Sequence, residues 1–294
     1  MRSSTKTGIL AEDFRSMIMS VSKTTKQRAL NALLARARAE TGKWLATATG
    51  GIYFLEDQNE RDISVVDIAV GLARKCRYSG NIAIDRNFYS VAEHSDLMAK
   101  KFEDDPSYFL GDERMMLEDY LKMKFHDATE FVFPDVPTPL KDMFPFFRTV
   151  EGYHDEKIER SVIPDPSGVL LTKKQVKEFD IRIRQDERSH LIAQPAYSAG
   201  VKPGNEVKPL GVEIRCLEWH QAAWDFMEDF VRAVDTYPAR LPENQERADQ
   251  QRAVVSAFLN KNPRPQSRDD LLDRIARLEA EVASLRGDAP DYGM

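Results

Sequence analysis

Residues 112–131 read DERMMLEDYLKMKFHDATEF, and the rest of the fold can be worked out from the pattern in this stretch. Its apolar residues Leu117, Tyr120, Leu121 and Phe125 recur at intervals that keep them on one side of a helix. This follows because an α-helix completes one turn in about 3.6 residues. The stretch is therefore predicted to be a long amphipathic helix.

The same helical period recurs along most of the chain, whereas strand patterns are few and short. Ser64 and Ser90 each precede a carboxylate by three residues, which is typical of a capped helix start. Residues 52–55 could form a strand or a loop, and the prolines at 134, 137 and 139 argue against helix there. We expect an all-α protein, with further helices at 12–40, 64–75, 90–102, 145–162, 172–193 and 217–236.

The chain is predicted to have three parts. Residues 1–40 form a helical N-terminal extension, residues 41–237 form the main helical bundle, and residues 238–294 form a linker and a short helical tail. The tail has apolar residues at the 4-3-4-3 spacing of a coiled-coil seam: Leu271, Ile275, Leu278, Val282 and Leu285. Two heptads are too few to be stable alone in water, so the seam either joins a homo-oligomer, as we predict, or folds back on its own core.

Composition restricts the possible partners. A formal charge of −6 argues against binding a nucleic-acid polymer, which relies on a dense basic face, but it leaves free nucleotides possible. No apolar run approaches the roughly 18 residues of a membrane span, and the N-terminus lacks the apolar core of a signal peptide. The cysteines Cys76 and Cys216 form no paired motif, which favours a reducing, cytoplasmic setting.

Several side chains form a candidate metal site. Asp180 lies between Val176 and Ile183 on the apolar stripe of its helix, where a carboxylate is costly unless it is paired with an arginine or bound to a metal. His126 and Asp127 are neighbours that could share one ion, and an imidazole with a carboxylate suits Mn, Co, Fe or Zn better than calcium.

Most single histidines are ordinary surface or core residues, and other histidines here have weaker contexts. His94 follows the capping Glu93 in the first turn of its helix, where loops converge. His154 and Asp155 form a second His-Asp pair, but they lie in a highly charged helix and are expected to stay away from the ion.

Four motifs in sequence order resemble the HD superfamily of metal-dependent phosphohydrolases. They are YSVAEHS at 89–95, HDATE at 126–130, DVPTPLK at 135–141 and VKEFD at 176–180. Within that superfamily, residues 41–236 are most similar to bacterial 5′-deoxynucleotidases and related phage deoxynucleotide hydrolases. The resemblance implies an all-helical domain that holds one divalent ion (Mn, Co, Zn, Fe or Mg) through His94, His126, Asp127 and Asp180.

The resemblance also suggests roles for groups near the ion. Glu130 is predicted to share the helix face of His126 and Asp127 and to act as the catalytic acid or base, although it could be an ordinary solvent-facing carboxylate. By resemblance, Asp135 contacts the sugar hydroxyl. Lys141 and Arg77 are the expected phosphate partners, and Arg77 could alternatively cap the end of its helix.

The function expected from this pattern is hydrolysis of a (deoxy)nucleotide. A deoxynucleoside monophosphate would lose phosphate, or a triphosphate such as dATP would lose triphosphate. Cyclic-nucleotide or alarmone hydrolysis and a non-catalytic nucleotide-sensing or interaction module are the alternatives. The chain departs from the resemblance at Pro134, where relatives often have glycine, and in both terminal segments.

Overall fold

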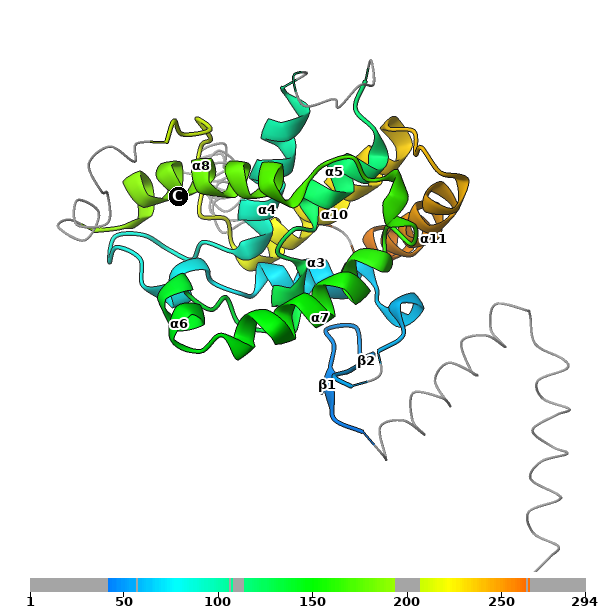
Figure 1. The fold of residues 1–294 in the computed structure, drawn as a ribbon, viewed down its shortest axis with the longest axis horizontal. Helices are drawn as coiled ribbons and strands as arrows, with labels where there is room; N and C mark the ends of the chain where they lie inside the picture. The colour runs from blue at the N-terminus through cyan, green and yellow to red at the C-terminus, as the bar shows by residue number, and fades with distance from the viewer. Residues whose placement is uncertain are drawn as a thin grey trace, which may run out of the picture. The chain divides into compact units, whose positions relative to one another are not determined.

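The computed structural model describes residues 42–56, 58–105, 107, 114–193, 207–262 and 264, in two units divided after Gln58 (Figure 1). The first unit contains a two-stranded antiparallel sheet of β1 (Trp44–Ala46) and β2 (Ile52–Phe54), with Trp44 opposite Phe54. The stretch at 52–55 is therefore mainly a strand. The turn between the strands includes Gly50 at φ +84°, a conformation that glycine adopts without steric cost.

The second unit is helical, which confirms the all-α class. Its α-helices are α3 (Val65–Ala73), α4 (Val91–Glu103), α5 (Leu117–Lys124), α6 (Thr138–Met143), α7 (Phe146–Arg160), α8 (Lys173–Leu191), α10 (Trp219–Thr236) and α11 (Pro242–Lys261). Its described 3-10 helices are η1 (Glu60–Asp62), η2 (Arg77–Gly80), η4 (Ala128–Phe131) and η5 (Pro166–Gly168). None of the helices in the described part of the chain combines the length and apolar character needed to cross a bilayer.

The predicted helix starts at Ser64 and Ser90 are confirmed. The Ser64 hydroxyl accepts the Val66 N–H, and the Ser90 hydroxyl accepts the Glu93 N–H at 3.0 Å. The Glu93 side chain instead accepts the backbone N–H groups of Arg215 and Leu217 at 2.9 and 2.8 Å. Glu93 therefore fixes the loop that precedes α10 against the start of α4.

The core is organised around α10, which packs against α3, α4, α5 and α11 (Figure 1). Phe226 and Phe230 of α10 are fully buried and meet the ring of Phe125 edge-on, with centroids 5.3 and 5.9 Å apart. Trp219, the first residue of the same helix, is 39% exposed and has the guanidinium of Arg74 4.3 Å from the centre of its ring.

The predicted continuous helix over 112–131 is wrong. Within the described part of this stretch, α5 ends at Lys124, the chain turns through Phe125, His126 and Asp127, and η4 follows. The His126 Nδ1 atom forms a hydrogen bond to the Met123 carbonyl at 2.9 Å, and the Phe125 ring packs against Phe226 of α10. A side chain thus takes an acceptor that a continuing helix would use for its own backbone.

The proline-rich stretch after η4 contains a helix that the sequence did not predict. α6 begins at Thr138, directly after Pro137, and has Pro139 in its first turn. A proline is tolerated there because the first N–H groups of a helix have no intrahelical partner.

The region expected to begin a polar linker at residue 238 contains α11, which packs on α10 and α3. Its buried residues include Asn244 and Gln251 as well as Ala248 and Val255. The Gln251 amide donates to the Ile63 carbonyl at 2.8 Å and accepts the Val65 N–H at 3.2 Å. Two of its four buried residues are amides rather than apolar side chains, and this explains why apolar periodicity did not reveal the helix.

We expect a protein ending at Tyr237 to be less stable by several kcal/mol than one ending at Arg264. The fully buried Glu118 accepts the Arg240 N–H at 2.8 Å, and removing residues 238–264 leaves that carboxylate without this donor. Each buried polar group left unpaired costs about 1–3 kcal/mol. Urea unfolding of the two proteins, followed by circular dichroism, measures the difference. Equal midpoints and slopes would show that α11 contributes no stability.

The predicted helical extension at 1–40 and the predicted seam from Leu271 to Leu285 lie outside the described residues. The homo-oligomer that the seam would join therefore stays a prediction.

Candidate metal centre

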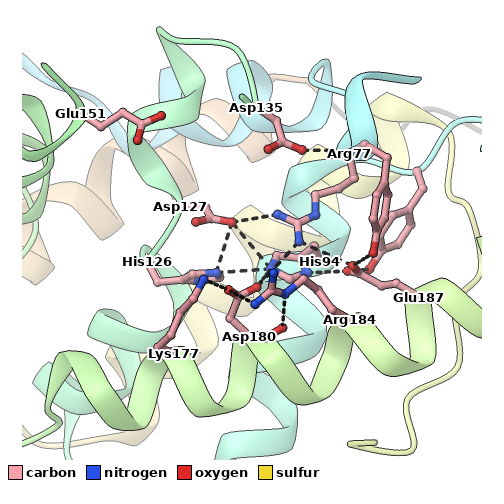
Figure 2. Close-up of polar contacts among 12 residues, drawn as sticks. Arg77, His94, His126, Asp127, Asp135, Glu151, Lys177, Asp180, Arg184 and Glu187 are labelled. Atoms are coloured by element: carbon pink, nitrogen blue, oxygen red, sulfur yellow. Dashed lines mark hydrogen bonds and ion pairs between the residues drawn. The ribbon is translucent and has the colours of Figure 1, made fainter. Parts of the chain in front are cut away.

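Three separate elements bring the candidate ligands together (Figure 2). His94 is in the first turn of α4, His126 and Asp127 form the turn after α5, and Asp180 is in the middle of α8. α4 packs against both α5 and α8, and the contacts of His94 with His126, Asp127 and Asp180 place its first turn beside the other two elements.

His94, His126 and Asp127 form a compact cluster. Their ligand atoms lie within 4.8 Å of one another. The Nε2 atoms of the two histidines are 3.2 Å apart, and Asp127 Oδ2 is 3.3 Å from His126 Nε2 and 3.6 Å from His94 Nε2. Two imidazole nitrogens and one carboxylate oxygen could therefore hold a transition-metal ion.

Asp180 lies at the edge of this cluster. Its Oδ1 atom is 3.8 Å from His94 Nε2, and its Oδ2 atom accepts from Lys177 Nζ at 2.5 Å. Arg184 Nη2 is also near this oxygen, at 3.6 Å. Oδ1 is also 3.8 Å from Arg77 Nη2, so this buried carboxylate has cations near both oxygens and the cluster beside one of them.

The carboxylates at the cluster are held in the ionised form. Burial alone would raise the pKa of Asp127, but His126 and Arg77 outweigh it and hold that pKa well below its usual value. Burial and the charge of Asp127 likewise oppose ionisation of Asp180, but the neighbouring His94, Arg184 and Arg77 outweigh them and lower the pKa of Asp180. Ionised carboxylates are the form that binds a cation.

Glu187 is a central residue of the site that the sequence reasoning missed. It is fully buried and accepts hydrogen bonds from His94 Nδ1 at 2.5 Å, Tyr78 Oη at 2.7 Å and Tyr89 Oη at 3.0 Å. Burial opposes its charge, yet Arg77 and His94 lower the pKa of Glu187 to about 2. An ionised Glu187 orients the His94 ring so that its Nε2 atom faces the cluster.

A signal for Glu187 was present in the sequence. It follows Ile183 by four residues, on the same buried stripe of α8 that contains Asp180. The argument applied to Asp180, that a carboxylate on a buried stripe needs a partner, applies equally to Glu187.

Arg77 is buried beside the cluster rather than at the end of α3. Its Nη1 atom is 3.0 Å from Asp127 Oδ2 and its Nη2 atom 3.5 Å from Glu187 Oε2, while its Nε atom is buried with no partner among the described residues. α3 ends at Ala73, so the alternative of Arg77 as its capping cation is wrong. The guanidinium lies beside the candidate ligands, and its role as a phosphate partner stays a prediction.

Asp135 holds the turn that carries Arg77. Its Oδ2 atom accepts the Tyr78 N–H at 3.1 Å, and its carbonyl accepts from the Ser79 hydroxyl at 3.3 Å. Tyr78 and Ser79 both have left-handed backbones, at φ 57° and 52°. Such conformations cost about 1–3 kcal/mol each and persist only when surrounding contacts impose them.

Glu130 is buried in η4 and not on the same helix as His126, so the prediction of a shared helix face is wrong. Its Oε2 atom has no hydrogen-bond partner among the described residues. Burial, together with the charges of Asp127 and Asp135, raises its pKa well above the usual value. Glu130 therefore lines the cavity as a buried carboxylate with a raised pKa and one unpaired oxygen among the described residues.

A cavity of about 410 Å³ adjoins the cluster, and most of the predicted site residues line it. Lys141 reaches it from α6, where its Nζ atom is 2.9 Å from Glu151 Oε1. The predicted residues among those that line it are Arg77, Asp127, Glu130, Asp135, Lys141 and Asp180. His94 and His126 join this group through their contacts with Asp127.

The two residues of the second His-Asp pair, His154 and Asp155, have different surroundings. His154 is buried with its ring centroid 4.9 Å from that of Phe133, which is a packing role. Asp155 accepts a hydrogen bond from Thr129 and lines a smaller cavity together with His126 and Asp127. Burial and the charge of Asp127 raise the pKa of Asp155 to about 6. Asp155 is therefore closer to the site than the sequence suggested.

The fold and the cluster together define an all-α protein with a partly buried His/Asp site that could hold a metal ion. No family model matches the chain. It is 32% identical over 149 residues to the Escherichia coli K12 protein named uncharacterized protein YfdR, across 50% of this chain and 72% of that protein. The chain therefore belongs to the same family as YfdR.

A second relative is an uncharacterized protein of Rhodobacter capsulatus. It is 39% identical over 99 residues, which are 33% of this chain. This chain covers 46% of that relative, less than half of its length.

Proposed function

We propose that the protein is a metal-dependent phosphohydrolase that acts on nucleotides. The observation that carries the proposal is the His94, His126 and Asp127 cluster at a cavity lined by Glu130 and by several cations. The resemblance of the four sequence motifs to HD phosphohydrolases supports it independently. His94, His126, Asp127 and Asp180 would hold one divalent ion, of which Mn, Co, Zn, Fe and Mg are the candidates.

The chain's own residues divide the work of the reaction. A divalent ion at the cluster would supply Lewis-acid chemistry and lower the pKa of a coordinated water. Glu130 takes the proton of the attacking water, because its raised pKa makes it a better base than an ordinary carboxylate. Arg77 and Lys141 supply positive charge at the cavity wall for the phosphate oxygens.

A phosphate-release screen tests this function. The purified full chain is incubated with Mn, Co, Mg or Zn and with deoxynucleoside mono- and triphosphates, ribonucleotides and cyclic nucleotides. Released phosphate is measured, and anion-exchange chromatography separates the nucleotide products and any tripolyphosphate, because opening a cyclic nucleotide releases no phosphate. We expect metal-dependent release from at least one nucleotide class. If every nucleotide stays intact in the presence of each metal, the protein is not a phosphohydrolase of this kind.

The Glu187→Gln variant is expected to bind the divalent ion about 10–100-fold more weakly, as is usual when the partner of a ligating histidine is lost. The substitution preserves shape but removes the negative charge that keeps His94 Nε2 free to bind. Titration with Mn²⁺, followed by electron paramagnetic resonance, measures the affinity. Glu178→Gln, an exposed change on the same helix, is the matched control. Equal affinities in the two variants would limit Glu187 to packing.

A further inference from the structure

One face of α8 extends the wall of the large cavity beyond the cluster. Lys177, Asp180, Arg184 and Arg188 follow one another at intervals of three, four and four, and all four line the cavity. With a rise of about 1.5 Å per residue, Arg184 lies roughly 6 Å and Arg188 roughly 12 Å along the helix from Asp180. The helix thus displays two guanidinium groups at increasing distance from the candidate metal ligand.

These two arginines differ from the other cations of the cavity in their partners. Arg77 pairs with Asp127 at 3.0 Å, Lys141 with Glu151 at 2.9 Å and Lys177 with Asp180 at 2.5 Å. Each of these three cations thus has a carboxylate partner at 3.0 Å or less, which it would share with any bound anion.

Arg184 and Arg188 are compensated less. Arg184 donates through Nε to the Asp180 backbone carbonyl at 3.1 Å, and its contact with the Asp180 carboxylate is long, at 3.6 Å. For Arg188, no carboxylate of the described residues lies within ion-pair distance. Both side chains are half-buried in a concave wall, and an arginine keeps its charge in proteins. A concave surface with surplus guanidinium charge is complementary to an anion.

From this arrangement we infer that Arg184 and Arg188 form a second anion subsite, which binds a phosphate group of the substrate remote from the bond that is cleaved. The inference rests on the proposed function and deepens it, because it assigns the substrate to nucleotides with more than one phosphate. A linear 5′-triphosphate and a 3′,5′-bisphosphate share this chemistry. A nucleoside monophosphate would leave the subsite empty.

Calorimetric titration of the full chain tests the subsite without requiring turnover. The probes are inorganic tripolyphosphate and orthophosphate, with Mg²⁺ in excess over either probe. The Arg188→Gln variant is expected to weaken tripolyphosphate binding by roughly tenfold, the effect of losing one charge-assisted contact, and orthophosphate binding by much less. Arg184→Gln should act in the same direction, and Arg188→Lys should retain part of the affinity.

The control is Arg182→Gln, an equal change of charge on α8 at a side chain that does not line this cavity and donates to the Lys208 carbonyl. Unchanged tripolyphosphate binding in Arg188→Gln, or an equal loss for both probes, overturns the inference. A nucleoside 3′,5′-bisphosphate and a 5′-triphosphate, titrated in parallel, show which position of the second phosphate depends on Arg188.

Failure of the subsite and failure of the proposed function are distinguishable. Selective loss of tripolyphosphate binding without nucleotide hydrolysis in the phosphate-release screen supports the subsite and rejects the enzyme. Hydrolysis combined with an equal effect of Arg188→Gln on both probes supports the enzyme and rejects the subsite. Thermal unfolding of each variant checks that the fold is retained.

Discussion

Replacing His126 with alanine is expected to remove the bound divalent ion and to lower nucleotide turnover by about 10³-fold or more. The ion's electrophilic contribution is worth several kcal/mol, and each 1.36 kcal/mol changes the rate tenfold. His126 contributes one of two imidazole nitrogens 3.2 Å apart, so the variant leaves one histidine beside Asp127. Elemental analysis of the purified protein and a phosphate-release assay measure the two effects.

His190→Ala is the appropriate comparison, because His190 lies near the end of α8 and is not one of the clustered ligands. It should retain both metal and activity. A His126→Ala protein that still carries one ion per chain and turns over normally would show that the cluster is not the metal centre.

Replacing Glu130 with glutamine is expected to lower turnover by roughly 10²–10⁴-fold while the ion stays bound, which is the usual contribution of a positioned acid or base. The amide keeps the shape of the side chain but cannot take a proton. Glu130 must be ionised to act as a base, so the wild-type rate should rise as the pH increases through its raised pKa. The variant should lack this rise, and pH–rate profiles of both proteins show it.

Asp155→Asn provides a sharp control for this assignment. Asp155 also has a raised pKa and lines a cavity beside His126, so it is the competing base within the described residues. We expect a much smaller loss of activity for this variant than for Glu130→Gln. The reverse order, with the acidic limb of the profile lost in Asp155→Asn, would transfer the role of base to Asp155.

The parts of the fold that the sequence predicted are those governed by local patterns. The helical period identified α3, α4, α7, α8 and α10, and the serine hydroxyls marked two of their starts. Asp180 was identified because it interrupts an apolar stripe, and the structure places it 3.8 Å from His94. Each of these features depends on residues close together in the chain.

The features that escaped prediction depend on contacts between distant residues. The break after Lys124 follows from the packing of Phe125 on α10 and from the bond between His126 and the Met123 carbonyl. α11 was hidden because its buried side chains include amides that satisfy polar groups far away in sequence, as Gln251 does for Val65. The spacing of apolar residues does not predict hydrogen bonds between residues that are distant in sequence.

The left-handed turn at Tyr78 and Ser79 implies a trade-off between stability and activity. Its two strained residues hold Arg77 at the cluster, and the Asp135 carboxylate and the Tyr78–Glu187 hydrogen bond maintain the strain. A glycine at position 79 would relieve part of this strain, and it would also loosen the chain segment that aims the guanidinium. Mutations selected only for thermal stability should therefore accumulate in this turn at the expense of the proposed activity.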